Sequence, residues 1–139
     1  MANSEQSSFT DLRYLSEVIA RKNFERFALY VMPSLELSPF HRAYYQALEL
    51  FTRGAIKKLI VTVPPQHGKS LGSSQLLPAY LLGLNPELKI ALASYAFTLA
   101  TKFNKRVQRV ISDAAYQNLF PDTCLKSGSR QSVSTRTPS

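Results

Sequence analysis

Three consecutive residues, Gly68, Lys69 and Ser70, have the side chains and the order of a nucleotide phosphate site. A glycine backbone can approach phosphate oxygens closely, a lysine ammonium reaches the β- and γ-phosphates, and a serine hydroxyl ligates Mg²⁺. Backbone N–H groups at the start of a following helix add to the attraction for an anion. The tripeptide therefore predicts a site for the phosphates of ATP, with Ser70 as the Mg²⁺ ligand.

The loop that precedes the tripeptide departs from the general phosphate-loop pattern. That pattern, G-x-x-x-x-G-K-[ST], places its first glycine at position 63, where this chain has Val63. Two consecutive prolines stiffen the loop and remove two N–H donors. The alternative is a plain strand-to-helix turn in which Ser70 caps the helix. The predicted cofactor-binding segment comprises Pro65, Gln66, His67, Gly68, Lys69 and Ser70.

The elements around the loop have an α/β order. A β-branched run from Leu59 to Val63 predicts a strand that leads into the loop, and the apolar run from Glu87 to Tyr95 predicts a second strand. A helix from about 69 to 82 joins them, and Pro78 within it predicts a kink or a short break. Two apolar strands joined by a helix predict a βαβ unit in a parallel sheet that is covered on both faces.

Helices are predicted on both sides of this unit. Apolar residues at helical spacing predict a first helix from about 10 to 31, which Pro33 ends. Ser38 as N-cap and Pro39 at the first helical position open a second helix, which stops at Gly54. A third helix is predicted from about 98 to 112. The expected order is therefore a parallel βαβ unit preceded by two helices.

Several of these features together resemble one protein family, the large terminase subunit of tailed bacteriophages. The resemblance covers about Phe9 to Leu125. It rests on the loop from Pro64 to Ser70, on the segment from Ile90 to Tyr95, and on a following helix with Phe103, Arg106, Val107 and Arg109. A loop without the first glycine is usual in that family. The resemblance implies an incomplete P-loop NTPase fold and an ATP-driven motor that packages viral double-stranded DNA.

The same resemblance implies partners and a location. In the manner of the family, the intact motor works as a homo-oligomeric ring with a portal protein and a small terminase subunit. Its cofactors are ATP and Mg²⁺, its place is the cytoplasm of a bacterial host cell, and it belongs to a phage or prophage. The single cysteine, Cys124, excludes an internal disulfide and suits a reducing compartment. No apolar run approaches the roughly 20 residues that a membrane span requires.

Parts that a motor needs are missing from this chain. A P-loop ATPase holds Mg²⁺ and activates water through acidic residues at the end of a second strand. The acidic residues after Ser70 are only Glu87, Asp113 and Asp122, and none of them ends a predicted strand. The nuclease domain of the family is also absent. We therefore expect an ATP-binding fragment that does not turn over ATP alone.

Residues outside the loop carry further expectations. The resemblance implies that Phe40 or His41 contacts adenine, although a helix-start histidine beside a core phenylalanine is the structural alternative. It also allows Arg106 or Arg109 to reach the ATP of a neighbouring subunit as an arginine finger. A solvated helix face is the alternative for these arginines, and together with two nearby lysines they can equally meet DNA phosphates. Tyr44 is expected to pack in the core.

Composition agrees with one domain and a tail. The chain has 139 residues, 45% of them hydrophobic, with a net charge of +8, which favours a polyanionic partner such as nucleic acid. Residues 126–139 contain one larger apolar side chain, Val133, and no acidic residue. Residues 1–125 are thus expected to form the front of the ATPase domain. Residues 126–139 are expected to be a disordered tail, either frameshifted or simply basic.

Two other functional classes fit part of the pattern. A small P-loop kinase uses the same kind of loop, but it normally keeps the first glycine and needs a lid with arginines. A non-catalytic basic protein that binds nucleic acid through its helices is the other alternative. Because a two-stranded sheet leaves unpaired edges, the fragment is also expected to be poorly stable or prone to aggregate.

Overall fold

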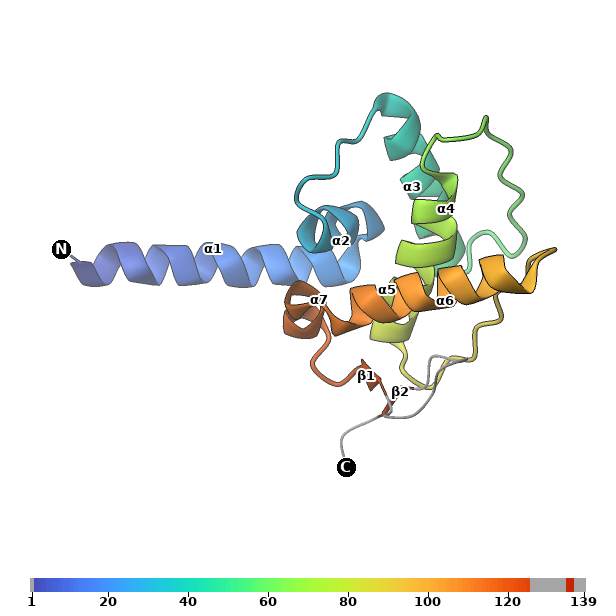
Figure 1. The fold of residues 1–139 in the computed structure, drawn as a ribbon. Helices are drawn as coiled ribbons and strands as arrows, with labels where there is room; N and C mark the ends of the chain where they lie inside the picture. The colour runs from blue at the N-terminus through green and yellow to red at the C-terminus, as the bar shows by residue number, and fades with distance from the viewer. Residues whose placement is uncertain (1, 126–134, 137–139) are drawn as a thin grey trace.

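A computed structural model of the chain describes residues 2–125 and 135–136. Helices dominate it, and α1 extends beyond the others on one side (Figure 1). The elements in chain order are α1 (Ala2–Lys22), α2 (Phe24–Val31), α3 (Pro39–Thr52), α4 (Lys69–Leu71), the π-helix η1 (Gly72–Leu76), α5 (Leu77–Leu84), α6 (Phe97–Ser112), α7 (Ala114–Leu119), β1 (Cys124–Leu125) and β2 (Thr135–Arg136). The two short strands pair antiparallel.

The predicted α/β fold, with its parallel βαβ unit, is wrong. Residues 58–63 and 87–95 form no strand, and β1 and β2 are the only strands in the described part of the chain. Burial alternates along the first segment, since Leu59 and Val61 pack on the core while Ile60 is 92% exposed. A strand of a parallel sheet is covered on both faces and paired at its edges. This segment has one covered face and no backbone ladder, so it stays extended coil.

The second segment repeats this behaviour. Ile90 and Leu92 pack against the helical core, whereas Tyr95 is 97% exposed. Each segment was expected to be apolar on both faces, but only alternate side chains are covered, and the sequence could not show that a pairing partner is lacking. A β-ladder is a nonlocal contact, and strand propensity alone does not supply one.

The helix predictions are largely confirmed. Helix α3 begins at Pro39 behind the N-cap Ser38, and α6 spans the predicted 98–112 and includes Phe97. The first predicted helix is divided into α1 and α2 at Asn23, whose side chain accepts a hydrogen bond of 2.9 Å from the Arg26 N–H. Asparagine competes with the helix for backbone donors and favours such a cap.

The helix after the loop changes its winding before Pro78. It begins as α4, widens into η1, and continues as α5. The Leu77 N–H donates to the Gly72 carbonyl, five residues back, which is the spacing of a π-turn. Pro78 has no N–H to donate to the carbonyl four residues back. The winding therefore changes in the turn before Pro78, while the chain stays helical from 69 to 84, and the kink expected at Pro78 stays a prediction.

An aromatic core fixes the helices relative to one another. It gathers side chains from α2, α3, α5 and α7, whose largest members are Phe24, Phe27, Tyr45, Tyr80 and Tyr116. The Tyr116 hydroxyl donates to the Ala79 carbonyl at 2.8 Å, so the polar ends of the core are also satisfied. This core holds α3 and the α4–α5 helix side by side, and the loop lies between them in sequence.

Two other expectations concern the whole chain. The tail predicted at 126–139 lies outside the described residues, apart from the backbone of Thr135–Arg136. None of the helices in the described ranges is long and apolar enough to cross a membrane.

Candidate phosphate-binding loop

The predicted loop has two backbone positions with positive φ. Gln66 has φ 66° and Gly68 has φ 69°, and these turns bring the chain to the helix that starts at Lys69. The Gly72 N–H donates to the Gly68 carbonyl at 3.1 Å, which closes the first helical turn. A non-glycine residue at positive φ is uncommon, so Gln66 marks a constrained turn. The loop is thus a tight double bend, not a smooth strand-to-helix turn.

The outer side of this loop is open to solvent. Pro65, Gln66, His67 and Lys69 are exposed, and Ser70 is half-buried at the start of the helix. His67 is held locally, because its Nδ1 lies 2.9 Å from the Pro65 carbonyl oxygen. An anion can therefore reach the Lys69 ammonium and the helix N-terminus without displacing a side chain of the core.

Helix α3 supports the loop from the other side. The Tyr44 hydroxyl donates to the Lys69 carbonyl at 2.9 Å, and the Ser73 hydroxyl donates to the same oxygen at 2.9 Å. A Cβ atom at Gly72 would lie 2.7 Å from Cε1 of Tyr44, so only glycine lets the tyrosine ring approach this closely. Burial raises the pKa of Tyr44, which keeps its hydroxyl protonated and able to donate.

His41 also faces the loop. The Ser38 N–H donates to Nδ1 of His41 at 3.2 Å, and the Ser38 hydroxyl lies 2.9 Å from the same atom. Since Nδ1 accepts, the proton of the neutral ring is on Nε2. A Cβ atom at Gly68 would lie 3.1 Å from that Nε2. The cap of α3 therefore places Nε2 of His41 beside the glycine of the loop.

Phe40 completes the contact between α3 and the loop. Its ring stacks on Tyr44 with centroids 6.2 Å apart and meets His67 edge-on at 6.3 Å. Phe40 is 40% exposed, so part of its side chain is accessible to a ligand. The structure thus brings Phe40 and His41 next to the predicted segment from Pro65 to Ser70. Their contact with adenine stays a prediction.

The predicted arginines belong to a different surface. Arg106 is half-buried and Arg109 is exposed on α6, which packs against η1 and α5. No hydrogen bond or ion pair joins either guanidinium to the loop among the described residues. A role as arginine finger for a neighbouring copy stays a prediction. The described residues also contain no group of three or more acidic, His or Cys side chains placed to hold a metal ion, and Ser70 as a Mg²⁺ ligand stays a prediction.

An apolar cavity lies elsewhere in the molecule. It has a volume of about 330 Å³ and lies between α5, α6 and the extended segment 88–92. Its wall includes Pro78, Leu82, Ile90, Leu92, Phe97 and Val107. None of the loop residues lines this cavity.

No family model, curated protein or solved structure matches this chain. The likeness to terminases therefore rests on the motif residues alone. Sequence reasoning identified the loop but missed its support, because Tyr44 was assigned to the core and Ser73 was not considered. The available signal was Gly72, a small residue one helical turn after Gly68, which permits close approach of another side chain.

Proposed function

We propose that this chain binds MgATP through its loop at Pro65–Ser70, as the nucleotide site of a protein similar to the front of a terminase large subunit. One observation carries the proposal: α3 supports the loop through Tyr44 and His41, while Lys69 stays exposed on the opposite side. A phosphate loop needs this combination, because its backbone must be preorganised before the anion arrives.

Each loop residue has a separate role in the proposed complex. The left-handed Gly68 turns its neighbouring N–H groups toward the phosphates, and the Lys69 ammonium neutralises the β- and γ-oxygens. Ser70 supplies a hydroxyl to Mg²⁺. The Nε2–H of His41 adds a donor at the edge of the loop, and the exposed part of Phe40 packs against the adenine ring.

Binding without turnover is the proposed activity of the chain by itself. Phosphoryl transfer depends on acidic groups that position the metal and the attacking water. The acidic residues that follow the loop do not supply the paired arrangement this needs. By resemblance, the proposed context is a DNA-packaging motor in the bacterial cytoplasm, with double-stranded DNA, a portal protein and a small terminase subunit as partners.

Calorimetric titration with MgATP tests the nucleotide site. The wild-type chain is expected to bind, and Lys69→Ala is expected to lose detectable binding because the charge that meets the phosphates is gone. Lys58→Ala is the matched control, since it removes an exposed lysine outside the loop. Equal affinity of the Lys69→Ala variant and the wild type would refute the assignment.

A second candidate function rests on α6. The side chains of Lys102, Lys105 and Arg109 are exposed, and at about 100° per residue they lie within roughly 60° of one another. Such a basic face suits the phosphates of nucleic acid. Under this alternative, DNA binding weakens steeply with salt, is reduced by Lys105→Glu and is unchanged by Lys69→Ala, and MgATP does not bind.

A further inference from the structure

Helix α1 carries apolar side chains that the rest of the described structure leaves uncovered. Phe9 is 73% exposed, Leu12 61%, Leu15 54% and Ile19 43%. With about 100° of rotation per residue, the four fall in a stripe roughly 120° wide. That is the width of the face that an amphipathic helix normally buries. We call these four residues the outer stripe.

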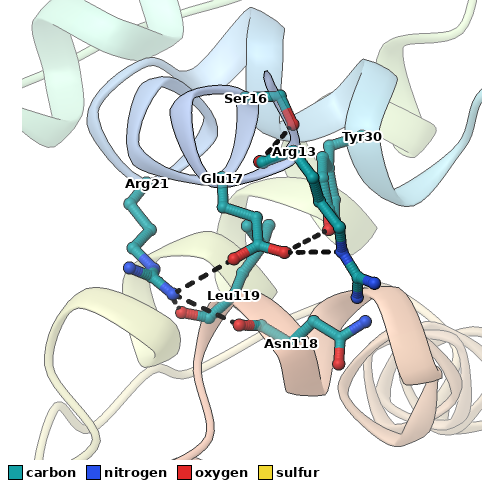
Figure 2. Close-up of polar contacts among 7 residues, drawn as sticks. All are labelled: Arg13, Ser16, Glu17, Arg21, Tyr30, Asn118 and Leu119. Atoms are coloured by element: carbon teal, nitrogen blue, oxygen red, sulfur yellow. Dashed lines mark hydrogen bonds and ion pairs between the residues drawn. The ribbon is translucent and has the colours of Figure 1, made fainter. Parts of the chain in front are cut away.

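The outer stripe is not the side by which α1 attaches to the molecule. Glu17 and Arg21 make the polar contacts of that attachment, as Figure 2 shows, and Ala20 at the end of the helix packs into the core. The Tyr30 hydroxyl donates to Glu17 at 3.2 Å, and Nε of Arg21 donates to the Leu119 carbonyl at 2.7 Å. Glu17 lies roughly opposite Leu15 on the helix, by the same rotation per residue. Helix α1 is therefore fixed in orientation with its outer stripe facing away from the body.

Charges beside the outer stripe indicate what covers it. Asp11 and Lys22 are exposed and make no ion pair within the described ranges. They are eleven residues apart, which returns them to within about 20° of each other on the helix, along one flank of the stripe. In a parallel two-fold pair, the flank that carries Asp11 and Lys22 would lie on opposite sides of the two helices, so these charges would not meet. Antiparallel copies place each Asp11 near Lys22 of the partner subunit and also oppose the helix dipoles favourably.

We propose that the outer stripe is the interface of a two-fold symmetric dimer, in which two copies of this chain pair their α1 helices antiparallel. A two-fold contact uses the same patch on both subunits, and the outer stripe with its Asp11–Lys22 flank is self-complementary in this sense. Two such stripes bury one another as in a short coiled coil. The inference does not depend on nucleotide binding, because α1 contributes nothing to the loop.

Sedimentation equilibrium of the full chain over a range of concentrations tests the dimer. The wild type is expected to show a reversible monomer–dimer equilibrium. Leu15→Glu is expected to weaken it by at least about tenfold, because a charge replaces buried apolar area twice per dimer. Tyr14→Glu is the matched control, since Tyr14 is 66% exposed on a different side of the helix, and it leaves the equilibrium unchanged.

A charge exchange tests the antiparallel sense. Asp11→Lys and Lys22→Asp each weaken the dimer, and the variant that carries both changes recovers the wild-type association. Far-ultraviolet circular dichroism checks that every variant keeps its helix content. A monomer at all concentrations, a dimer that Leu15→Glu does not affect, or a double variant weaker than both single variants overturns the proposal.

Discussion

The hydroxyl of Tyr44 donates a hydrogen bond to the carbonyl of Lys69 at 2.9 Å, so a core tyrosine holds the backbone of the residue proposed to meet the nucleotide phosphates. Tyr44 is only 6% exposed, whereas the Lys69 side chain projects into solvent. The packing of α3 and the shape of the loop are thus coupled through one bond. Changes to Tyr44 are expected to alter nucleotide binding although its side chain does not touch the ligand.

Tyr44→Phe removes this bond and keeps the ring. The Lys69 carbonyl retains its bond from Ser73, so the expected loss of stability is about 0.5–1.5 kcal/mol. MgATP affinity is expected to fall several-fold, because the loop is less well ordered before binding. Urea unfolding and calorimetry measure the two effects. Ser73→Ala, which removes the other donor to the same oxygen, serves as the comparison, and unchanged affinity in both variants would show that Lys69 needs no such support.

Gly72→Ala tests the close approach of α3. The added Cβ would lie 2.7 Å from the Tyr44 ring, and overpacking of this kind costs about 1–3 kcal/mol. Gly54→Ala is the control for crowding, because its Cβ meets nothing within 4 Å, although its φ of 73° adds a backbone strain that Gly72 does not have. Urea unfolding is expected to show the loss of stability of Gly72→Ala, and calorimetry is expected to show a loss of MgATP binding only for this variant. Two variants that both bind normally would contradict the described contact.

A double-mutant cycle tests the contact between His41 and Gly68. Gly68→Ala places a side chain at φ 69° and 3.1 Å from Nε2 of His41, so both backbone strain and crowding result. The left-handed conformation alone costs about 1–2 kcal/mol. His41→Ala is expected to relieve only the crowding, giving a coupling of about 0.5 kcal/mol or more in unfolding measurements. Strict additivity would mean that the imidazole does not touch the loop.

Because tyrosines are buried, we expect the free energy of unfolding to fall at alkaline pH. Burial raises the pKa of Tyr45 to about 12, from the ordinary value near 10. Above pH 10 the unfolded chain releases this proton while the folded chain keeps it, so stability is constant below about pH 10 and falls between about pH 10 and 12. The expected loss is roughly 2–3 kcal/mol from this residue. Tyr45→Phe should flatten the decline, as measured by unfolding at a series of pH values; an equally steep decline would assign it to other groups.

The sequence predicted the helices because their signals are local. Ser38 and Pro39 mark the start of α3 within one turn, and the apolar spacing of α6 is visible in the chain itself. The division at Asn23 was missed, since the apolar period continues across it. Helix α7 was missed as well, although Asp113 accepts from the Ala115 N–H and is a usual cap.

The two segments around Ile60 and Tyr95 were wrongly predicted to be strands, because a strand forms only where another segment pairs with its backbone. Ile60 and Tyr95 lie on faces that no helix covers, and no segment pairs with their backbones in the described structure. The candidate loop was found from three residue types in order. The support of the loop by Tyr44 was not found, because a hydrogen bond between residues 25 positions apart produces no recognisable pattern in the sequence. Because apolar side chains in these segments are exposed, we still expect the chain to be poorly stable or prone to aggregate.

Amide hydrogen exchange with and without MgATP tests the central claim most directly. The nucleotide is expected to slow exchange at Gly68, Lys69 and Ser70, because their N–H groups would bind phosphate oxygens. Adenosine, which lacks the phosphates, is the control and should leave these amides unchanged. Protection confined to the loop would support the phosphate site. Saturating MgATP that leaves the loop amides exchanging at their original rates would contradict it.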